Sequence, residues 1–163
     1  MPAFLFVLFL EVPMSLVTRP ARPEDAEAIR TLVRAAYARW VPVLGREPRP
    51  MQVDYAAAVL VHEFALVEAG GALVALIEME ARADHCWIEN VAVTPSQQGR
   101  GLGRALLDLA DARARGYGLD EIRLLTNGKM DANRRLYAAC GYEETLEEPF
   151  LDGTVVYLRK RLG

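Results

Sequence analysis

The sequence predicts an α/β sandwich built around one mixed sheet, and three observations support this. Strand and helix patterns follow one another in the order β α α β β β α β α β β, without an internal repeat or a linker. A strand–helix–strand unit spans residues 85–126, and such a unit makes a right-handed crossover between two parallel strands. The chain has 163 residues, close to the roughly 150 of one average domain, so we expect a single core.

The beginning of the chain is its one awkward segment. The run from Phe4 to Leu10 is entirely apolar, but no basic residue precedes Arg19, as a secretory signal would require. The run is also far shorter than the ~20 residues of a membrane span. Met14 offers a second possible start. We therefore expect residues 1–13 to be a dispensable extension or a mis-assigned start, and residues 14–163 to form the domain.

The first half of the domain begins with a strand over 15–20 and a helix over 23–39, whose first turn carries a proline and acidic residues that suit the positive end of the helix dipole. Three prolines between 41 and 50 exclude a regular helix, so we expect a stiff loop there. Residues 51–61 again suit a helix. Two glycines between the strands at 64–68 and 72–77 predict an antiparallel hairpin.

The second half continues with a strand over about 85–93, which ends before Pro95, and an amphipathic helix from residue 102 that frays at 116–118. A strand follows at 122–126. Asp131 is the expected N-cap of a helix through Cys140, with Gly141 in the left-handed position that commonly follows a helix. An Asp-Gly turn joins the last two strands, at 142–146 and 154–160.

Composition narrows the class of partner. The net charge is −3 and the pI about 5.5, so no overall positive field attracts nucleic acid. Cys86 and Cys140 are isolated, and neither they nor His62 and His85 have metal-ligand spacing, so we expect neither a disulfide scaffold nor a metal site. We interpret both histidines as turn or surface residues. We expect a cytoplasmic protein that binds neither nucleic acid nor membrane.

A glycine-rich loop carries the most informative chemistry. It follows a strand that ends in Val91, Ala92 and Val93, and it opens the next helix with Gln98, Gly99, Arg100, Gly101, Leu102, Gly103 and Arg104. Unpaired N–H groups at a helix N-terminus suit a pyrophosphate, although a plain glycine turn is an alternative. The spacing fits neither a Walker loop nor the dinucleotide fingerprint.

The pattern Gln98-x-x-Gly101-x-Gly103 resembles the GNAT superfamily of acyl-CoA-dependent N-acetyltransferases. A second segment agrees with that family's other cofactor motif and includes Asn127, Asp131, Asn133, the run from Leu136 to Gly141, and Tyr142. The resemblance covers about residues 15–160 and implies a single-domain GNAT-like mixed central sheet flanked by helices. It also implies acetyl-CoA as co-substrate, with pantetheine between two splayed strands beside residues 91–93 and pyrophosphate on residues 98–104.

The resemblance also suggests catalytic roles. A backbone N–H at or near Val91 would stabilise the oxyanion, Tyr137 would protonate the leaving thiolate, and Asn133 would contact the cofactor. Core packing is the alternative for Tyr137. For the base we keep two candidates open, Glu89, a carboxylate in an apolar strand, and a water chain. Arg100 and Arg104 either face the phosphates or are solvated.

The acceptor pocket would lie on the other side of the sheet. Trp40, Tyr55 and Asn127 are our candidates to line it, and the alternative for both aromatic residues is core packing. The function we predict is direct acetyl transfer from acetyl-CoA to a primary amine of a small molecule or peptide. Two alternatives are a non-catalytic acyl-CoA-binding or sensing module and a purely structural interaction domain. A homodimer could form if residues 155–158 paired across an interface.

Overall fold

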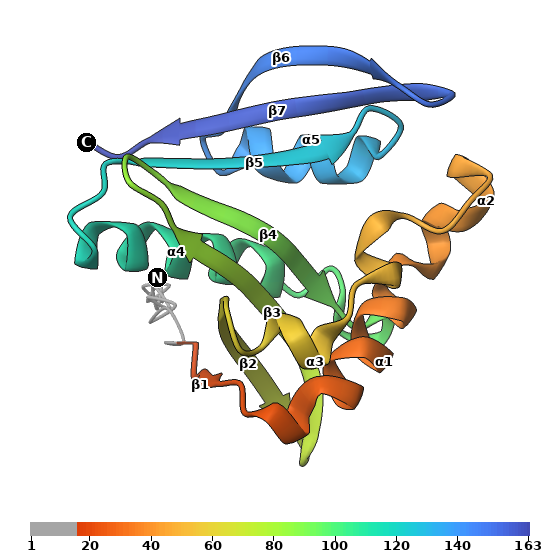
Figure 1. Cartoon of the computed structure of the whole chain (residues 1–163), viewed down its shortest axis with the longest axis vertical. Helices are drawn as coiled ribbons and strands as arrows, with labels where there is room; N and C mark the ends of the chain where they lie inside the picture. Colours follow the sequence, from red (N-terminus) through yellow and green to blue (C-terminus); the bar gives the residue numbers. More distant parts are fainter. Residues whose placement is uncertain (1–15) are drawn as a thin grey trace, which may run out of the picture.

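A computed structural model describes residues 16–163, so the extension predicted at residues 1–13 lies outside the described part of the chain. Within residues 16–163 one sheet holds the strands in the order β1-β2-β3-β4-β5-β7-β6 (Figure 1). Their bounds are β1 Arg19–Pro20, β2 Glu63–Ala69, β3 Ala72–Ala81, β4 Cys86–Val93, β5 Glu121–Asn127, β6 Glu143–Phe150 and β7 Gly153–Arg161. Among these seven described strands only β4 and β5 pair in parallel. The predicted mixed sheet is confirmed.

Helices cover both faces of this sheet. The α-helices are α1 Ala26–Tyr37, α2 Val41–Leu44, α3 Tyr55–Ala58, α4 Leu102–Gly116 and α5 Asp131–Ala139. Residues of α1 and α3 pack with β2 and β3 in one hydrophobic core. Residues of α4 and α5 pack on the other face in a second core that reaches β5 and β7 (Figure 1). The three-layer arrangement follows from this division.

Two predicted elements in the first half are wrong in detail. The proline-rich segment is not all loop, because α2 and a 3-10 helix, Arg49–Gln52, each accept a proline in the first turn, where no N–H bond is needed. Gly45, with φ of 69°, ends α2 in the left-handed conformation. The helix predicted at 51–61 shrinks to α3, which begins where Asp54 caps the N–H of Ala57 at 3.2 Å.

The helix after β5 begins differently from the prediction. Met130 occupies the N-cap position of α5 without a side-chain hydrogen bond, and Asp131 is the first helical residue. An acidic residue in the first turn still suits the helix dipole. At the other end, Gly141 has φ of 91°, which confirms its expected left-handed conformation.

A β-bulge divides β4 into two parts. Ile88 pairs with Met79 and Asn90 pairs with Glu78, so Glu89 is one residue too many for strict pairing. The extra residue exchanges the two faces of the strand. Ile88 therefore belongs to the core under α4, whereas Ala92 belongs to the core under α1.

The parallel strands β4 and β5 separate soon after they meet. Their pairing consists of Cys86 with Ile122 and Trp87 with Arg123, although β4 continues to Val93. Figure 1 shows the two strands diverging toward their carboxyl ends. Backbone groups of β4 beyond Trp87 have no strand partner on that side within the described residues, which agrees with the expected splay.

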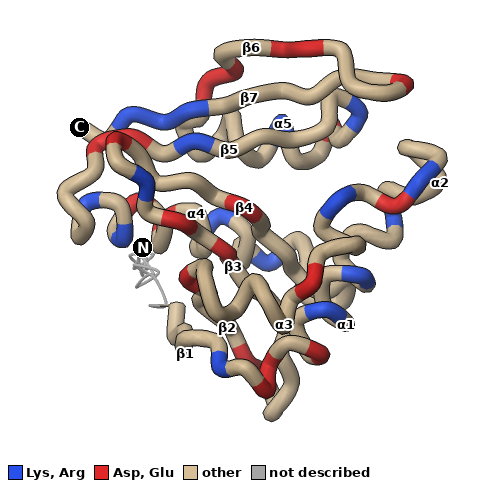
Figure 2. The backbone as a smooth tube through the Cα atoms, in the orientation of Figure 1, with Lys and Arg blue, Asp and Glu red and all other residues tan. Residues whose placement is uncertain are grey.

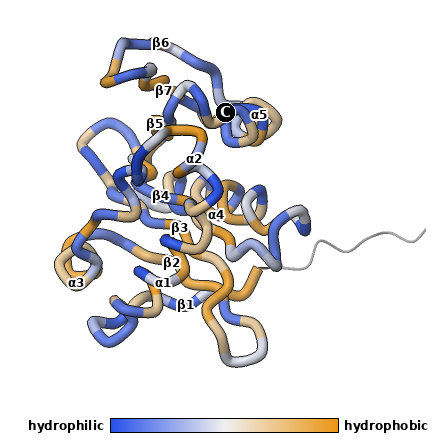
Figure 3. Tube along the Cα trace, turned by 90° about the vertical axis from the view of Figure 1, so that its right-hand side faces the viewer, coloured by the Kyte–Doolittle hydropathy of each residue, from blue (hydrophilic) through white to orange (hydrophobic). Residues whose placement is uncertain are grey.

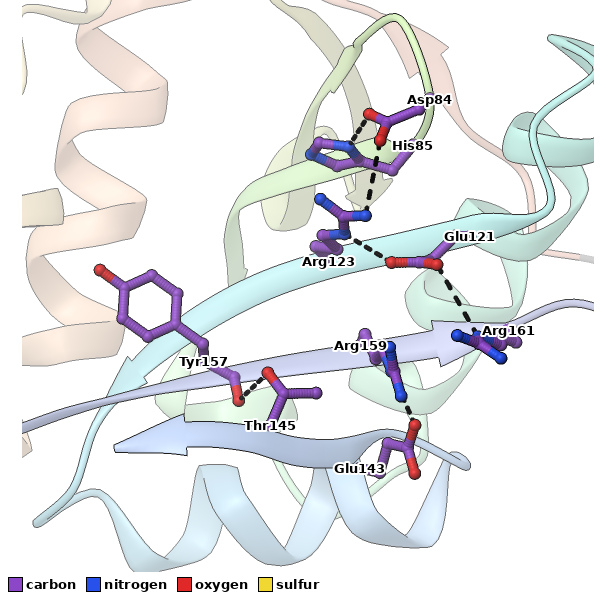
Figure 4. Close-up of polar contacts among 9 residues, drawn as sticks. All are labelled: Asp84, His85, Glu121, Arg123, Glu143, Thr145, Tyr157, Arg159 and Arg161. Carbon is purple, nitrogen blue, oxygen red and sulfur yellow. Dashed lines mark hydrogen bonds and ion pairs between the residues drawn. The ribbon is translucent and has the colours of Figure 1, made fainter. Parts of the chain in front are cut away.

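The last hairpin corrects the predicted dimer contact. Strand β7 lies between β5 and β6, so residues 155–158 already pair on both edges and cannot pair across an interface. Polar contacts follow these strands (Figure 4), including Arg159 Nε to Glu143 Oε1 at 2.7 Å. The exposed outer strand β6 is acidic in Figure 2 and mostly hydrophilic in Figure 3. Among residues 16–163 no helix has the length and hydrophobicity to cross a membrane.

Candidate active site

A first cavity, of about 310 Å³, lies beside the end of β4 and the start of α4. It is lined by most of the residues predicted to bind the cofactor: Val91, Ala92, Val93, Gln98, Gly99, Gly101, Leu102, Gly103, Arg104, Asn133 and Tyr137. Arg100 does not line it, and its Nη1 donates to Gln97 Oε1 at 3.4 Å. The structure thus brings both sequence motifs to one cavity.

The glycine-rich loop fits an anionic group that must approach the backbone closely. Gly99 and Gly101 have φ of 75° and 82°, which favours glycine at both positions. A Cβ on Gly103 would lie 3.3 Å from Leu136 Cδ2. The first N–H groups of α4, a helix of 15 residues, have no acceptor within the helix. These features match a pyrophosphate at the N-terminus of α4.

A second cavity, of about 660 Å³, opens on the other side of the splayed strands. Its walls come from β3, β4, β5, the segment after α2 and the β6–β7 turn. Four residues line both cavities: Tyr37, Val91, Asn133 and Tyr137. A molecule in one cavity and a molecule in the other would therefore meet beside these four side chains.

Tyr137, on α5, stands at this meeting point. Its side chain is buried, and its ring packs edge-on against Tyr142 with centroids 5.8 Å apart. No hydrogen bond of its hydroxyl is found within residues 16–163. Burial raises the pKa of Tyr137 to about 12. The phenol therefore keeps its proton at neutral pH and has a free O–H to donate.

A chain of hydrogen bonds crosses the wall of the second cavity. Tyr37 donates its hydroxyl to Asn90 Oδ1 at 2.8 Å, Asn90 Nδ2 donates to the Tyr55 oxygen at 3.3 Å, and Tyr55 donates to the Pro50 carbonyl at 2.8 Å. Burial raises the pKa of both tyrosines. Tyr55 thus lines the acceptor side as expected. Asn90 was missed, although a polar residue in an apolar strand is a usable signal.

A buried carboxylate and a partly exposed histidine form an acid–base pair at the second cavity. Glu78 Oε1 lies 2.7 Å from His62 Nδ1, and the Glu78 side chain is only 5% exposed. Burial raises the pKa of Glu78, against the opposing effect of His62. Sequence reasoning missed Glu78 because it ended the strand at residue 77, whereas β3 continues to Ala81. His62 lies in a bend before β2, as expected of a turn histidine, but its ring reaches the Glu78 carboxylate.

Glu89 also lines the second cavity, at the bulge of β4. Its carboxylate lies 3.8 Å from Arg82 Nη2, while Arg82 Nε donates to Glu80 at 2.9 Å. Ligand atoms of His62, Glu80 and Glu89 all lie within 4.8 Å of one another. Arg82 thus contacts both glutamates of this cluster. His85 was also expected at the surface but is buried, beside Asp84 (Figure 4).

The remaining acceptor candidates separate. Trp40 lines the first cavity and not the second, and it packs with Leu44 and Met130 in a small hydrophobic cluster. Asn127 lines the second cavity, where its Oδ1 accepts a hydrogen bond from the Lys129 N–H at 2.9 Å. Trp40 was predicted to line the acceptor pocket, and it lies instead on the cofactor side, because the chain enters α2 immediately after it.

Comparison with known proteins agrees with this geometry. The fold, together with a match to a family model, defines the class of protein as an acetyltransferase that uses acetyl-CoA. Residues 27–142 match the acetyltransferase (GNAT) family, and the chain belongs to that family. No protein of curated function matches the sequence significantly.

Solved structures have the same fold. The ribosomal-protein-S18-alanine N-acetyltransferase from Escherichia coli is 20% identical, with a TM-score of 0.73 over 90% of this chain and 93% of that one. The PaiA N-acetyltransferase from Thermoplasma acidophilum, in complex with coenzyme A, is 17% identical, with a TM-score of 0.74 over 91% and 99%. The IAA acetyltransferase from Bacillus cereus is 22% identical, with a TM-score of 0.67 over 90% and 99%. At these identities the likeness concerns the fold.

Proposed function

We propose that this protein transfers an acetyl group from acetyl-CoA directly to a primary amine of a small molecule or peptide. The observation that carries the proposal is the meeting of two cavities at Tyr37, Val91, Asn133 and Tyr137. The first cavity has the glycine loop suited to a pyrophosphate, and the second has polar and ionisable groups suited to an amine. Reaction at their junction needs no movement of a bound group between sites.

The cofactor residues have separable tasks in this proposal. Backbone N–H groups from Gly99 to Arg104 would hold the pyrophosphate, and Gln98, whose Nε2 donates to the Val93 carbonyl at 3.0 Å, would fix the loop to the strand end. The unpaired edge of β4 at residues 91–93 would bind the pantetheine amides as a strand would. Acetyl-CoA supplies the activated acyl group when bound.

The acyl transfer requires a hydrogen-bond donor for the oxyanion and a proton donor for the leaving thiolate. A backbone N–H at Val91 would stabilise the oxyanion that forms when the amine nitrogen bonds to the carbonyl carbon. Tyr137 would give its proton to the sulfur as the C–S bond breaks. Its raised pKa, about 12, keeps it in the donating form.

The amine must also lose a proton before or during attack. We call the second cavity the acceptor cavity. Glu78, which is buried there and paired with His62, is better placed to accept the proton than Glu89, which lies beside Arg82. A carboxyl group whose pKa burial has raised is a stronger base than an ordinary one. The proton balance is then complete, because one proton leaves toward Glu78 and one reaches the thiolate from Tyr137.

Direct transfer is supported by the cysteines. Cys86 and Cys140 are buried and line neither cavity. Burial raises the pKa of Cys86 to about 11 and also raises that of Cys140, which weakens both thiols as nucleophiles. A covalent acetyl-cysteine intermediate is therefore disfavoured.

The test is a turnover screen of pooled amines with acetyl-CoA, read both as free thiol released and as acetylated product by mass. Amine-dependent thiol release with a matching product would support the proposal. Thermal stabilisation by CoA without any turnover would instead indicate an acyl-CoA-binding or sensing module. A melting temperature that CoA leaves unchanged would indicate a structural domain.

A further inference from the structure

Two arginines at the wall of the second cavity, the proposed acceptor cavity, have no ion pair or side-chain hydrogen bond within residues 16–163. Arg46 and Arg49, in the segment after α2, both line the second cavity. The Nε of Arg46 is buried and has no hydrogen-bond acceptor within residues 16–163. A buried guanidinium N–H without an acceptor costs free energy, which a bound anion would recover.

The surrounding carboxylates are already engaged. Glu47, between the two arginines, accepts from Arg34 Nη2 at 2.6 Å. Figure 2 shows this alternation of basic and acidic positions beside α2. Asp152, on the β6–β7 turn, lies 3.3 Å from Lys129 Nζ. Arg46 contributes to the lowered pKa of Asp152, but less than the Asp152 backbone and Lys129 do.

Arg46 is also held in a defined place. Its guanidinium carbon lies 5.6 Å from the centre of the Phe150 ring, in a cation–π contact. By contrast, the third arginine of this cavity, Arg82, is matched by Glu80 and Glu89. Unmatched positive charge is thus confined to the Arg46 and Arg49 side.

We propose that Arg46, with Arg49, binds a carboxylate of the acceptor, so that the acceptor is an amino acid or a short peptide whose amine is acetylated. This substrate class rests on the proposed acetyltransferase function. The carboxylate would sit at the arginine wall, and the amine would point toward the junction where Tyr137 and Val91 lie. Glu78 and His62 would be available to the amine. Arg49 is the weakest of the charges that act on the pKa of Glu78, so Arg46 is the main candidate for the carboxylate.

The first experiment compares each amino acid with its carboxamide, which retains the amine and removes the negative charge. We expect the wild-type protein to prefer the free acid in kcat/KM. Arg46→Gln should reduce kcat/KM for the acid about 10- to 100-fold, the value of one lost charge-assisted hydrogen bond. The same variant should change kcat/KM for the carboxamide, and KM for acetyl-CoA, less than about 3-fold.

Arg115→Gln is the matched control, because it removes the same charge from an exposed position on α4 that lines neither cavity. Equal effects of the two variants, or equal loss for acid and carboxamide, would overturn the carboxylate assignment. Preference for 2-aminoethyl phosphate over every amino acid would overturn it in favour of a phosphate.

A second measurement does not depend on turnover. Deaminated carboxylates, such as propionate and 3-phenylpropionate, are titrated into the CoA-saturated protein and followed by ligand-observed NMR. Binding that Arg46→Gln abolishes supports the anion subsite even if no amine is acetylated, in which case the proposed function alone fails. Acetylation of amines without Arg46-dependent carboxylate binding would overturn the subsite and leave the proposed function standing.

Discussion

Removal of the Tyr137 hydroxyl gives the sharpest test of the catalytic geometry. The hydroxyl has no hydrogen-bond partner among residues 16–163, so Tyr137→Phe should change the free energy of unfolding by less than about 1 kcal/mol. The Phe ring keeps the edge-on contact with Tyr142. General acid catalysis contributes about 10²–10⁴-fold, equal to about 2.7–5.5 kcal/mol of barrier. The loss of kcat should therefore far exceed the loss of stability.

The assay is single-turnover acetyl transfer to an accepted amine, which excludes product release from the measured rate, together with KM for acetyl-CoA. Tyr142→Phe is the matched control. Its hydroxyl is buried without a hydrogen-bond partner among residues 16–163, and its ring lies 5.8 Å from that of Tyr137, but Tyr142 lines neither cavity. We expect a fall of about 10²-fold or more for Tyr137→Phe alone. An unchanged rate would refute the acid role, and an increase in KM with an unchanged rate would reassign Tyr137 to cofactor binding.

Three further predictions follow from other parts of the structure. Gly101→Ala and Gly70→Ala each place a Cβ at a positive φ, 82° and 60°, with no atom within 4 Å. Each should therefore lower the free energy of unfolding by about 1 kcal/mol. Only Gly101→Ala should also reduce the increase in melting temperature that CoA produces. Burial raises the pKa of Glu78, so its contribution to stability is present below the pKa of the unfolded carboxyl and is lost as pH rises through the folded pKa. Glu78→Gln should therefore raise the melting temperature at pH 8, have little effect at pH 4, and lower kcat, and a lower melting temperature at pH 8 would contradict this. Hydrogen bonds from Arg19 lower the pKa of Asp25 to about 2, so stability is present above the pKa of the unfolded Asp and is lost as pH falls toward 2. Asp25→Asn should cost about 1–2 kcal/mol at pH 7 after allowance for solvent screening, and urea titration at pH 7 and pH 2 should show the difference disappear at the lower pH.

Regular elements with clear periodicity could be predicted from the sequence. The unit from β4 through α4 to β5 is one example, because its strand is apolar, its helix is amphipathic and its glycines lie at the junction. The prediction that the glycine loop and Tyr137 lie at one site also succeeded, because both belong to elements with a clear sequence pattern. Short helices escaped prediction, because one turn at α2 or α3 has too few residues for a period and depends on local caps such as Asp54.

The acceptor side of the site could be predicted less well. The bulge at Glu89 breaks the two-residue alternation, so the strand pattern alone does not reveal that Asn90 and Ala92 face the α1 layer. Glu78 was missed because a carboxylate next to an apolar run looks like the end of a strand. The lack of a hydrogen-bond acceptor for Arg46 Nε within residues 16–163 depends on contacts between segments that are distant in the chain. No local sequence pattern indicates such contacts.

The bulge in β4 has a consequence for how this protein can change. Deletion of Glu89 would leave Ile88 opposite Met79 and Asn90 opposite Glu78, because these two β3 residues are adjacent, so the strand would lose its bulge and residues 90–93 would keep their faces. The cofactor edge at Val91 and Val93 would therefore keep its pairing with β3. The chain can thus lose or change the residue at the bulge, and with it one carboxylate of the second cavity, without turning over the strand that the cofactor needs.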